Sequence, residues 1–144
     1  MLENVQRRCT KMVPALRNMP YHERLRALGL PTLAYRRRRA DMVQVYRIMH
    51  GIDNVDASKF FSAAQTHNTR GHNKKIFKKR TRLRLRGEFF SQRTVNDWNS
   101  LPPDLAEAKT LNEFKSLLNK HWSNLPCKFD DWSDKSRGAI IDFV

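Results

Sequence analysis

Two adjacent carboxylates, Asp130 and Asp131, come closest in type and spacing to a catalytic centre in this 144-residue sequence. Nucleotidyl transfer would use such groups to hold two metal ions about 4 Å apart. That chemistry would also require an aromatic residue where Lys128 stands and a strand–turn–strand scaffold, whereas the surrounding sequence is polar. We therefore interpret the two carboxylates as solvated surface and expect no catalytic centre in this chain.

The cysteines and histidines give no sign of a metal centre or cofactor. Cys9 and Cys127 have no Cys or His partner at zinc-ligand spacing, and two cysteines make no disulfide framework. His67 and His72 lie five residues apart in a polar stretch, which favours a solvated loop over a zinc site. We expect reduced thiols in an intracellular protein, nuclear or cytoplasmic. No apolar run reaches the roughly 18 residues of a membrane span, so no membrane partner is expected.

Basic residues provide the chemistry that the sequence does offer. The chain has 28 Lys and Arg against 14 Asp and Glu, which gives a net charge of +14. Residues 1–86 hold 21 of these cations with 5 acidic residues, whereas residues 87–144 hold 7 with 9. A field of this sign attracts polyanions, so the backbone of RNA or DNA is the expected partner. The alternative is one soluble domain with an uneven surface charge.

Two groups of cations are the candidate nucleic-acid-binding residues. One is a run of four arginines in a predicted helix, and the other lies in the most basic stretch, residues 70–86, where 9 of 17 residues are Lys or Arg. The candidates are Arg36, Arg37, Arg38, Arg39, Lys74, Lys75, Lys78, Lys79, Arg80, Arg82, Arg84 and Arg86. Because consecutive positions sweep around a helix, at least one of the four arginines must lie near its buried side. Asp41 and Glu23 are its possible partners there.

Residues 80–86 alternate strictly between arginine and other residues. This period predicts a half-buried strand with Leu83 and Leu85 on the core and the arginines facing outward. Same-face arginines would then recur every ~6.6 Å, which roughly matches phosphate spacing along a nucleic-acid backbone. The alternative is an edge strand that its charges protect from pairing. Ile76 and Phe77 indicate a partner strand or an extended lead-in.

Apolar residues at spacings of three and four predict helices elsewhere in the chain. The predicted spans are 2–13, 20–29, 32–50, 87–98 and 110–122. Gly29 and Gly51 follow periodic segments and mark helix ends. Thr110 and Glu113 have the spacing of a capping box.

These elements predict a mainly α protein, a helical bundle with a short basic β-strand or hairpin around residues 74–86. Composition divides the chain into four segments. They are a basic helical segment (1–64), a basic loop and strand (65–86), a C-terminal helical pair (87–124) and a polar tail (125–144). We expect Phe89, Phe90 and Trp98 to be core residues, because aromatic residues at helical spacing more often pack inside than stack on bases.

An ordered series of short motifs resembles the region after the polymerase palm in LINE-type non-LTR retrotransposon reverse transcriptases, particularly jockey-like ones. In order, the motifs are LENVQRRCTK (2–11), YHERL (21–25), LGLPTL (28–33), YRR (35–37), VYRIMHG (45–51), TRGH (69–72), FFSQR (89–93), WNSLP (98–102) and FK (114–115). The order and spacing hold over residues 2–122, and the residues that follow depart from the pattern.

This resemblance implies a non-catalytic C-terminal part of such an enzyme, without its endonuclease and polymerase domains. The parent protein would be an RNA-directed DNA polymerase with a magnesium-dependent palm, and the aspartate box of that palm has no counterpart here. Only the role after the palm carries over, which is to help hold template RNA, primer or target DNA through their phosphates. The missing polymerase domain would be a further partner.

Two other interpretations are compatible with the residues. The chain could be a translated retroelement remnant without a selected function, in which case a loosely packed or partly exposed core is expected. It could instead be a protein-interaction module that docks through its C-terminal helical face. In that case substitution of the arginines at 80–86 leaves partner binding unchanged, whereas Phe114→Asp or Leu117→Asp removes it.

Overall fold

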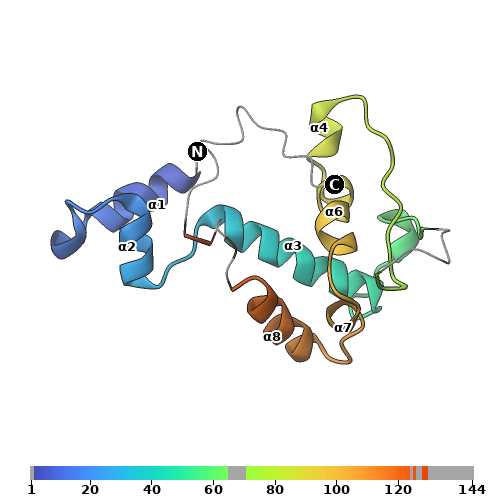
Figure 1. The fold of residues 1–144 in the computed structure, drawn as a ribbon. Coiled ribbons are helices and arrows are strands. Elements are labelled where there is room, and N and C mark those ends of the chain that lie inside the picture. The colour runs from blue at the N-terminus through green and yellow to red at the C-terminus, as the bar shows by residue number, and fades with distance from the viewer. Residues whose placement is uncertain (1, 65–70, 124, 126–127, 130–144) are drawn as a thin grey trace. The chain divides into compact units, whose positions relative to one another are not determined.

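The computed structural model describes residues 2–64, 71–123, 125, 128 and 129, and over these residues the protein is mainly helical (Figure 1). The predicted fold class is confirmed at this level. The chain forms two compact units, Met1–Arg38 with Ser123–Val144 and Arg39–Trp122. We call them the N-terminal unit and the central unit. No helix in the described part of the chain is both long and apolar enough to cross a membrane.

The N-terminal unit is built on helix α1 (Leu2–Lys11), which packs beside helix α2 (Tyr21–Leu28) (Figure 1). A short 3₁₀ turn, η1 (Pro14–Leu16), lies between them in the sequence. Helix α1 ends before the predicted Val13, because a residue that precedes proline is driven to an extended conformation, and Val13 has ψ 112°. Gly29 ends α2 as predicted, with φ 63° and its N–H donating to the carbonyl of Arg26.

Helix α3 (Leu33–Met49) is the longest helix described, close to the predicted span 32–50. From residue 39 onward it belongs to the central unit, where Met42, Val45 and Tyr46 are buried. Helix α8 (Leu111–His121) supplies the opposite side of this core. The rings of Tyr46 and Phe114 stack with centroids 4.3 Å apart, and the Tyr46 hydroxyl donates to the carbonyl of Ala108 at 2.7 Å.

The capping box at the start of α8 is confirmed. The Thr110 hydroxyl accepts the backbone N–H of Glu113 at 3.2 Å, and the Glu113 carboxylate accepts the backbone N–H of Lys109 at 2.9 Å. The first bond satisfies a donor that the first turn of a helix otherwise leaves without a partner. The second joins Glu113 to the residue before the N-cap instead of to the N–H of Thr110.

Short helical turns connect the two long helices of the central unit. They are η2 (Ala57–Lys59), α4 (Arg84–Gly87), α5 (Phe90–Arg93), α6 (Val95–Asn99) and α7 (Pro103–Ala106). The single helix predicted for residues 87–98 is wrong, because α5 begins only after the extended Phe89 and a turn at Thr94 separates α5 from α6. The Thr94 hydroxyl donates to the carbonyl of Phe90 at 2.7 Å, a local bond that competes with helix continuation.

The predicted strand or hairpin at residues 74–86 is not formed. In the described part of this region there is one isolated antiparallel bridge, between Ala63 and Ile76, and residues from Arg84 onward are helical. Leu83 and Leu85, which were predicted to face the core, are 71% and 75% exposed. A segment with alternating residue types forms a strand only where a neighbouring strand pairs with its backbone N–H and C=O groups. Here the backbone bonds to itself instead, for example from Gly87 N–H to Leu83 O at 3.2 Å.

Candidate nucleic-acid interface

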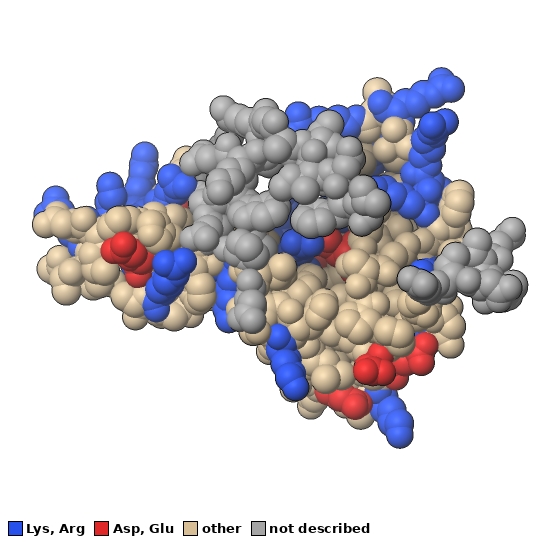
Figure 2. Space-filling view, in the orientation of Figure 1, with Lys and Arg blue, Asp and Glu red and all other residues tan. Residues whose placement is uncertain are grey.

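The most exposed candidate cations lie together on residues 78–86 of the central unit, which we call the basic segment. All six are solvent-exposed: Lys78, Lys79, Arg80, Arg82, Arg84 and Arg86. Among the described residues, no carboxylate forms an ion pair with any of them. Figure 2 shows Lys and Arg side chains extending into solvent around α4. Within the part of the chain that the structure describes, the charge of the basic segment is thus not neutralised by ion pairs.

Part of the basic segment surrounds a shallow hollow of about 300 Å³. Its lining residues are Lys79, Arg80, Thr81, Arg82, Leu83, Arg86 and Gln92. Gln92 is only 7% exposed, and its buried amide oxygen has no hydrogen-bond partner among the described residues. The hollow is thus lined mainly by cations, which are the groups that contact the phosphates of a nucleic-acid backbone.

The chain that enters the basic segment is fixed by side chains of α6. The indole N–H of Trp98 donates to the carbonyl of Lys74 at 2.8 Å. The Asn99 amide accepts the N–H of Ile76 at 2.9 Å and donates to the Ile76 carbonyl at 2.8 Å. It thus takes up the backbone groups of Ile76 that the bridge with Ala63 leaves free. With Trp98 and Ile76 both buried, these bonds set where the exposed cations begin.

Lys74 and Lys75, two further candidates, are half-buried. The Lys74 ammonium lies 2.6 Å from His50 Nε2, while His50 Nδ1 lies 3.0 Å from the carbonyl of Tyr46. An ammonium can only donate, so His50 accepts at Nε2 and carries its proton at Nδ1. Burial lowers the pKa of His50, and the charge of Lys74 lowers it further. The Lys74 ammonium is therefore directed toward His50 within the central unit.

The run of four arginines at residues 36–39 divides between the two units. The first two are exposed and the last two half-buried, in agreement with the expectation that at least one lies near the buried side. Arg36 donates to the side-chain oxygen of Gln6 at 3.4 Å within the N-terminal unit. Arg39 donates to the side-chain oxygen of Asn119 at 2.8 Å within the central unit. The run is not one continuous phosphate-binding stripe.

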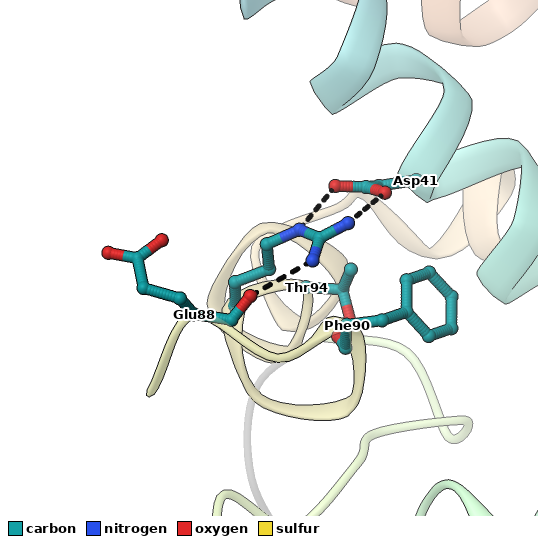
Figure 3. Close-up of polar contacts among 5 residues, drawn as sticks. Asp41, Glu88, Phe90 and Thr94 are labelled. Carbon is teal, nitrogen blue, oxygen red and sulfur yellow. Dashed lines mark hydrogen bonds and ion pairs between the residues drawn. The ribbon is translucent and has the colours of Figure 1, made fainter. Parts of the chain in front are cut away.

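An ion pair that the sequence did not indicate holds α5 against α3. Arg93 donates from Nε and Nη2 to the two carboxylate oxygens of Asp41, at 2.9 and 2.8 Å, and from Nη1 to the Glu88 carbonyl at 3.0 Å (Figure 3). The hydrogen bond to Asp41 raises the pKa of Arg93. Asp41 was a possible partner for the arginine run, but here it anchors the helix that follows the basic segment.

His72 is a core residue, and its prediction as a solvated loop residue is wrong. It is 3% exposed, its Nε2 lies 3.0 Å from the carbonyl of Trp98, and its ring meets the Trp98 ring edge-on at 5.7 Å. Burial is the main reason that the pKa of His72 is lowered, and the charges of Lys75 and Lys74 add to this effect. The hydrogen bond to Trp98 and the charge of Glu107 act in the opposite direction.

We expect the stability of the central unit to fall as the pH decreases from ~7.5 to ~5.5. A histidine in the unfolded chain takes up a proton near pH 6.5, whereas folded His72 and His50 resist protonation because their pKa values are lowered. The unfolded state then binds more protons, so the stability that neutral histidines provide is present above this range and is lost below it.

Urea unfolding at several pH values measures this dependence. His72→Gln is expected to make the stability less dependent on pH, and the matched control His121→Gln, at an exposed position, is expected to leave the dependence unchanged. An unchanged pH profile in His72→Gln would show that His72 does not carry the effect.

Several residues considered for metal or acid chemistry lie outside the described residues. They are His67, Cys127, Asp130 and Asp131, together with most of the predicted polar tail at 125–144. Cys9 is an exposed free thiol. Within the described residues, no three His, Cys, Asp or Glu side chains are grouped in a way that could hold a metal ion.

The sequence matches no protein-family model, and no curated protein or solved structure matches it either. The resemblance to LINE-type reverse transcriptases therefore stays a prediction that rests on the motif series.

Proposed function

We propose that this chain is a non-catalytic nucleic-acid-binding segment that contacts RNA or DNA phosphates through the basic segment of its central unit. The observation that carries the proposal is that all six cations of residues 78–86 are exposed and have no carboxylate ion-pair partner among the described residues. Lysine and arginine that serve a fold are commonly paired with acidic groups. Unpaired cations at this density favour a polyanion.

The polar features around the basic segment support contact with a backbone rather than with base edges. The described hollow is lined mainly by cations. Such groups position a protein on phosphates and sugars and carry little sequence information. Binding is therefore expected to depend strongly on salt and weakly on base sequence.

The same proposal includes an origin in a reverse transcriptase of the LINE type. The support is the ordered motif series over residues 2–122, with a basic helical chain that lacks an aspartate box. In this role the chain would help hold template RNA, primer or target DNA beside the polymerase domain of its parent, in the nucleus or cytoplasm. The chain itself would have no enzymatic activity.

The burial of α8 favours this function over a protein-docking module. Of the two residues that the docking interpretation names, Leu117 is half-buried. Phe114, together with Leu118 on the same helix, is fully buried within the central unit. A face that already packs against Tyr46 does not offer these side chains to a partner. Full burial of Trp98 and Val95 in the same core also argues against a loosely packed remnant. The expectation that Phe89 is a core residue is wrong, since its side chain is 51% exposed.

Fluorescence-anisotropy titration of a short RNA hairpin and a DNA duplex across ~50–200 mM salt tests the proposal. The test variant carries Arg→Ala at 80, 82, 84 and 86, and the control carries Lys→Ala at 59, 109, 115 and 120, which removes the same charge elsewhere on the central unit. If each arginine contacts one duplex phosphate, the slope of log affinity against log salt flattens by about three to four units in the test variant.

The charge-matched control is expected to change the slope much less. Equal slopes in the two variants would mean that net charge alone drives binding, and the basic segment would then not be the interface. Circular dichroism of both variants checks that they remain folded, which is expected because the four substituted arginines are exposed.

A further inference from the structure

A buried arginine in the N-terminal unit has no acidic partner among the residues that the structure describes. Arg24, on α2, is 3% exposed and bonds only to neutral acceptors among the described residues. Its Nε donates to the Thr10 hydroxyl at 3.1 Å, and its Nη1 donates to the Met19 carbonyl at 2.6 Å. Nη2 lies 3.4 Å from the Arg7 carbonyl. The three bonds fix the guanidinium in place, and none of these described acceptors carries a negative charge.

A buried charge without a nearby charge of opposite sign destabilises the folded protein. A guanidinium stays protonated at any pH at which a protein is folded. Loss of its proton therefore cannot reduce the free-energy cost of its desolvation. Neutral hydrogen-bond acceptors offset part of the lost hydration, whereas a nearby anion offsets much more. The burial of Arg24 therefore indicates a position at which an anion is stabilised.

Arg24 also lines a hollow of about 470 Å³ that is rich in cations. The lining residues are Arg7, Lys11, Arg17, Asn18, Met19, Pro20, Tyr21 and Arg24. They include four cations and no acidic residue. Arg7 and Lys11 are four residues apart on α1 and so lie on one face of that helix. None of the lining residues belongs to the two groups of candidate cations that the sequence indicated, at residues 36–39 and 74–86.

The ring of Tyr21 holds two of these guanidinium groups in position. The Cζ atoms of Arg7 and Arg24 lie 5.0 and 5.5 Å from its centroid, within the range of a cation–π contact. The Tyr21 hydroxyl donates to one oxygen of Glu3 at 2.6 Å, and the other oxygen accepts the backbone N–H of Leu33 at 3.0 Å. Glu3 is thus engaged by Tyr21 and Leu33 rather than by Arg24.

We propose that this hollow is a phosphate-binding site with Arg24 as its anchor. Guanidinium groups match the geometry of phosphate oxygens and form charge-assisted hydrogen bonds with them. Arg24 and Arg7 are held before the ligand arrives, and the exposed Lys11 and Arg17 add charge at the rim. The ligand chemistry is a phosphate group, either of a nucleic-acid strand or of a free polyphosphate. The site is independent of the basic segment, which belongs to the other unit.

NMR of the full chain tests the site directly, because the side-chain Nε–H of Arg24 is buried and hydrogen-bonded to Thr10. The protein carries Arg→Ala at 80, 82, 84 and 86, so that binding at the basic segment does not interfere. The expected result is a saturable shift of the Arg24 Nε–H signal with pyrophosphate at constant ionic strength. A shift that only follows ionic strength, or no shift, would overturn the proposal.

Two exposed arginines provide matched variants that avoid unfolding the unit. Arg17→Ala, at the rim, is expected to weaken pyrophosphate binding about tenfold, as for loss of a charge-assisted bond. Arg8→Ala, on α1 but outside the hollow, is expected to change it little. Equal weakening in both variants would mean that general charge attracts the phosphate, and the site assignment would be wrong.

A short single-stranded oligonucleotide identifies the source of the phosphate. If the oligonucleotide saturates the shift of the Arg24 signal at a lower concentration than pyrophosphate does, the site is assigned to a nucleic-acid backbone. If only pyrophosphate saturates the shift, the site is assigned to a free polyphosphate. Both results support a phosphate site. The NMR result does not depend on the outcome of the anisotropy experiment on the basic segment. The protein used for NMR already lacks the four arginines at 80, 82, 84 and 86.

Discussion

Replacement of Trp98 by alanine is expected to destabilise the central unit by about 3–5 kcal/mol, the cost of removing a large buried aromatic side chain. Trp98 is fully buried, and its ring lies 6.2 Å from the ring of Phe114 and 5.7 Å from the ring of His72. Surrounding side chains cannot fill a cavity of that size without moving α6 or α8. Urea unfolding of the variant measures this loss.

The same substitution is expected to loosen the chain that leads into the basic segment. The Trp98 indole donates to the Lys74 carbonyl, and the adjacent Asn99 holds both backbone groups of Ile76. Hydrogen exchange at the Ile76 amide should therefore become faster in Trp98→Ala, even where the rest of the unit stays folded.

Trp98→Phe is the matched control for these two effects. It keeps an aromatic ring in the core but removes the N–H that bonds to Lys74, so a smaller loss of stability is expected, with the loss of one hydrogen bond contributing about 1 kcal/mol. If Trp98→Ala and wild type unfold at the same urea concentration, Trp98 is not the centre of this core.

The helices that the sequence predicted well are those whose signals are local. Helix α3 begins and ends within one residue of its predicted span, because an apolar face lies between Pro31 and Gly51. Gly51 has φ 64°, a conformation that glycine adopts without the steric cost of a Cβ atom. Thr110 and Glu113 likewise define the start of α8 through bonds within a few residues.

The strand at residues 80–86 could not be judged from its own residues. Period two tells which side chains share a face of a strand, but a strand also needs a neighbour that accepts its backbone hydrogen bonds. The single bridge described here pairs Ile76 with Ala63, and the chain then enters the helical turn α4. The arginines are still exposed, but their spacing is not the regular repeat that a strand would give.

Charge alone also could not sort the candidate cations into ligand-binding and structural groups. Lys74 faces His50, which is 24 residues away in the sequence, and Arg93 pairs with Asp41, which is 52 residues away. Nothing in the local sequence marks such pairs, because the fold creates them. Arg24 was missed for the same reason, since it lies outside the dense runs of cations in the sequence and becomes distinctive only through its burial.

Asp41→Ala is expected to cost about 2 kcal/mol of stability in the central unit, less than the 3–5 kcal/mol of a fully buried pair because both side chains keep some contact with water. The side chains of Arg93 and Asp41 are 27% and 16% exposed. Removal of the carboxylate leaves a partly buried guanidinium that still donates to the Glu88 carbonyl but has lost both bonds to its anion.

A double-mutant cycle separates the pair from the packing of each side chain. Asp41→Ala, Arg93→Ala and the double variant are compared by urea unfolding, and the double variant is expected to lose less than the sum of the two single losses. Strict additivity would mean that the two side chains contribute independently. Their close bidentate geometry would then add nothing beyond packing.

The Asp41→Ala variant also tests whether the position of the basic segment matters or only its charge. The substitution removes one negative charge, which by itself should strengthen binding to a polyanion. However, α5 directly follows α4, and the ion pair is what holds α5 against α3. If RNA binding weakens in the folded variant despite its higher positive charge, the placement of the basic segment contributes to affinity. If binding strengthens, charge dominates and the ion pair serves only stability.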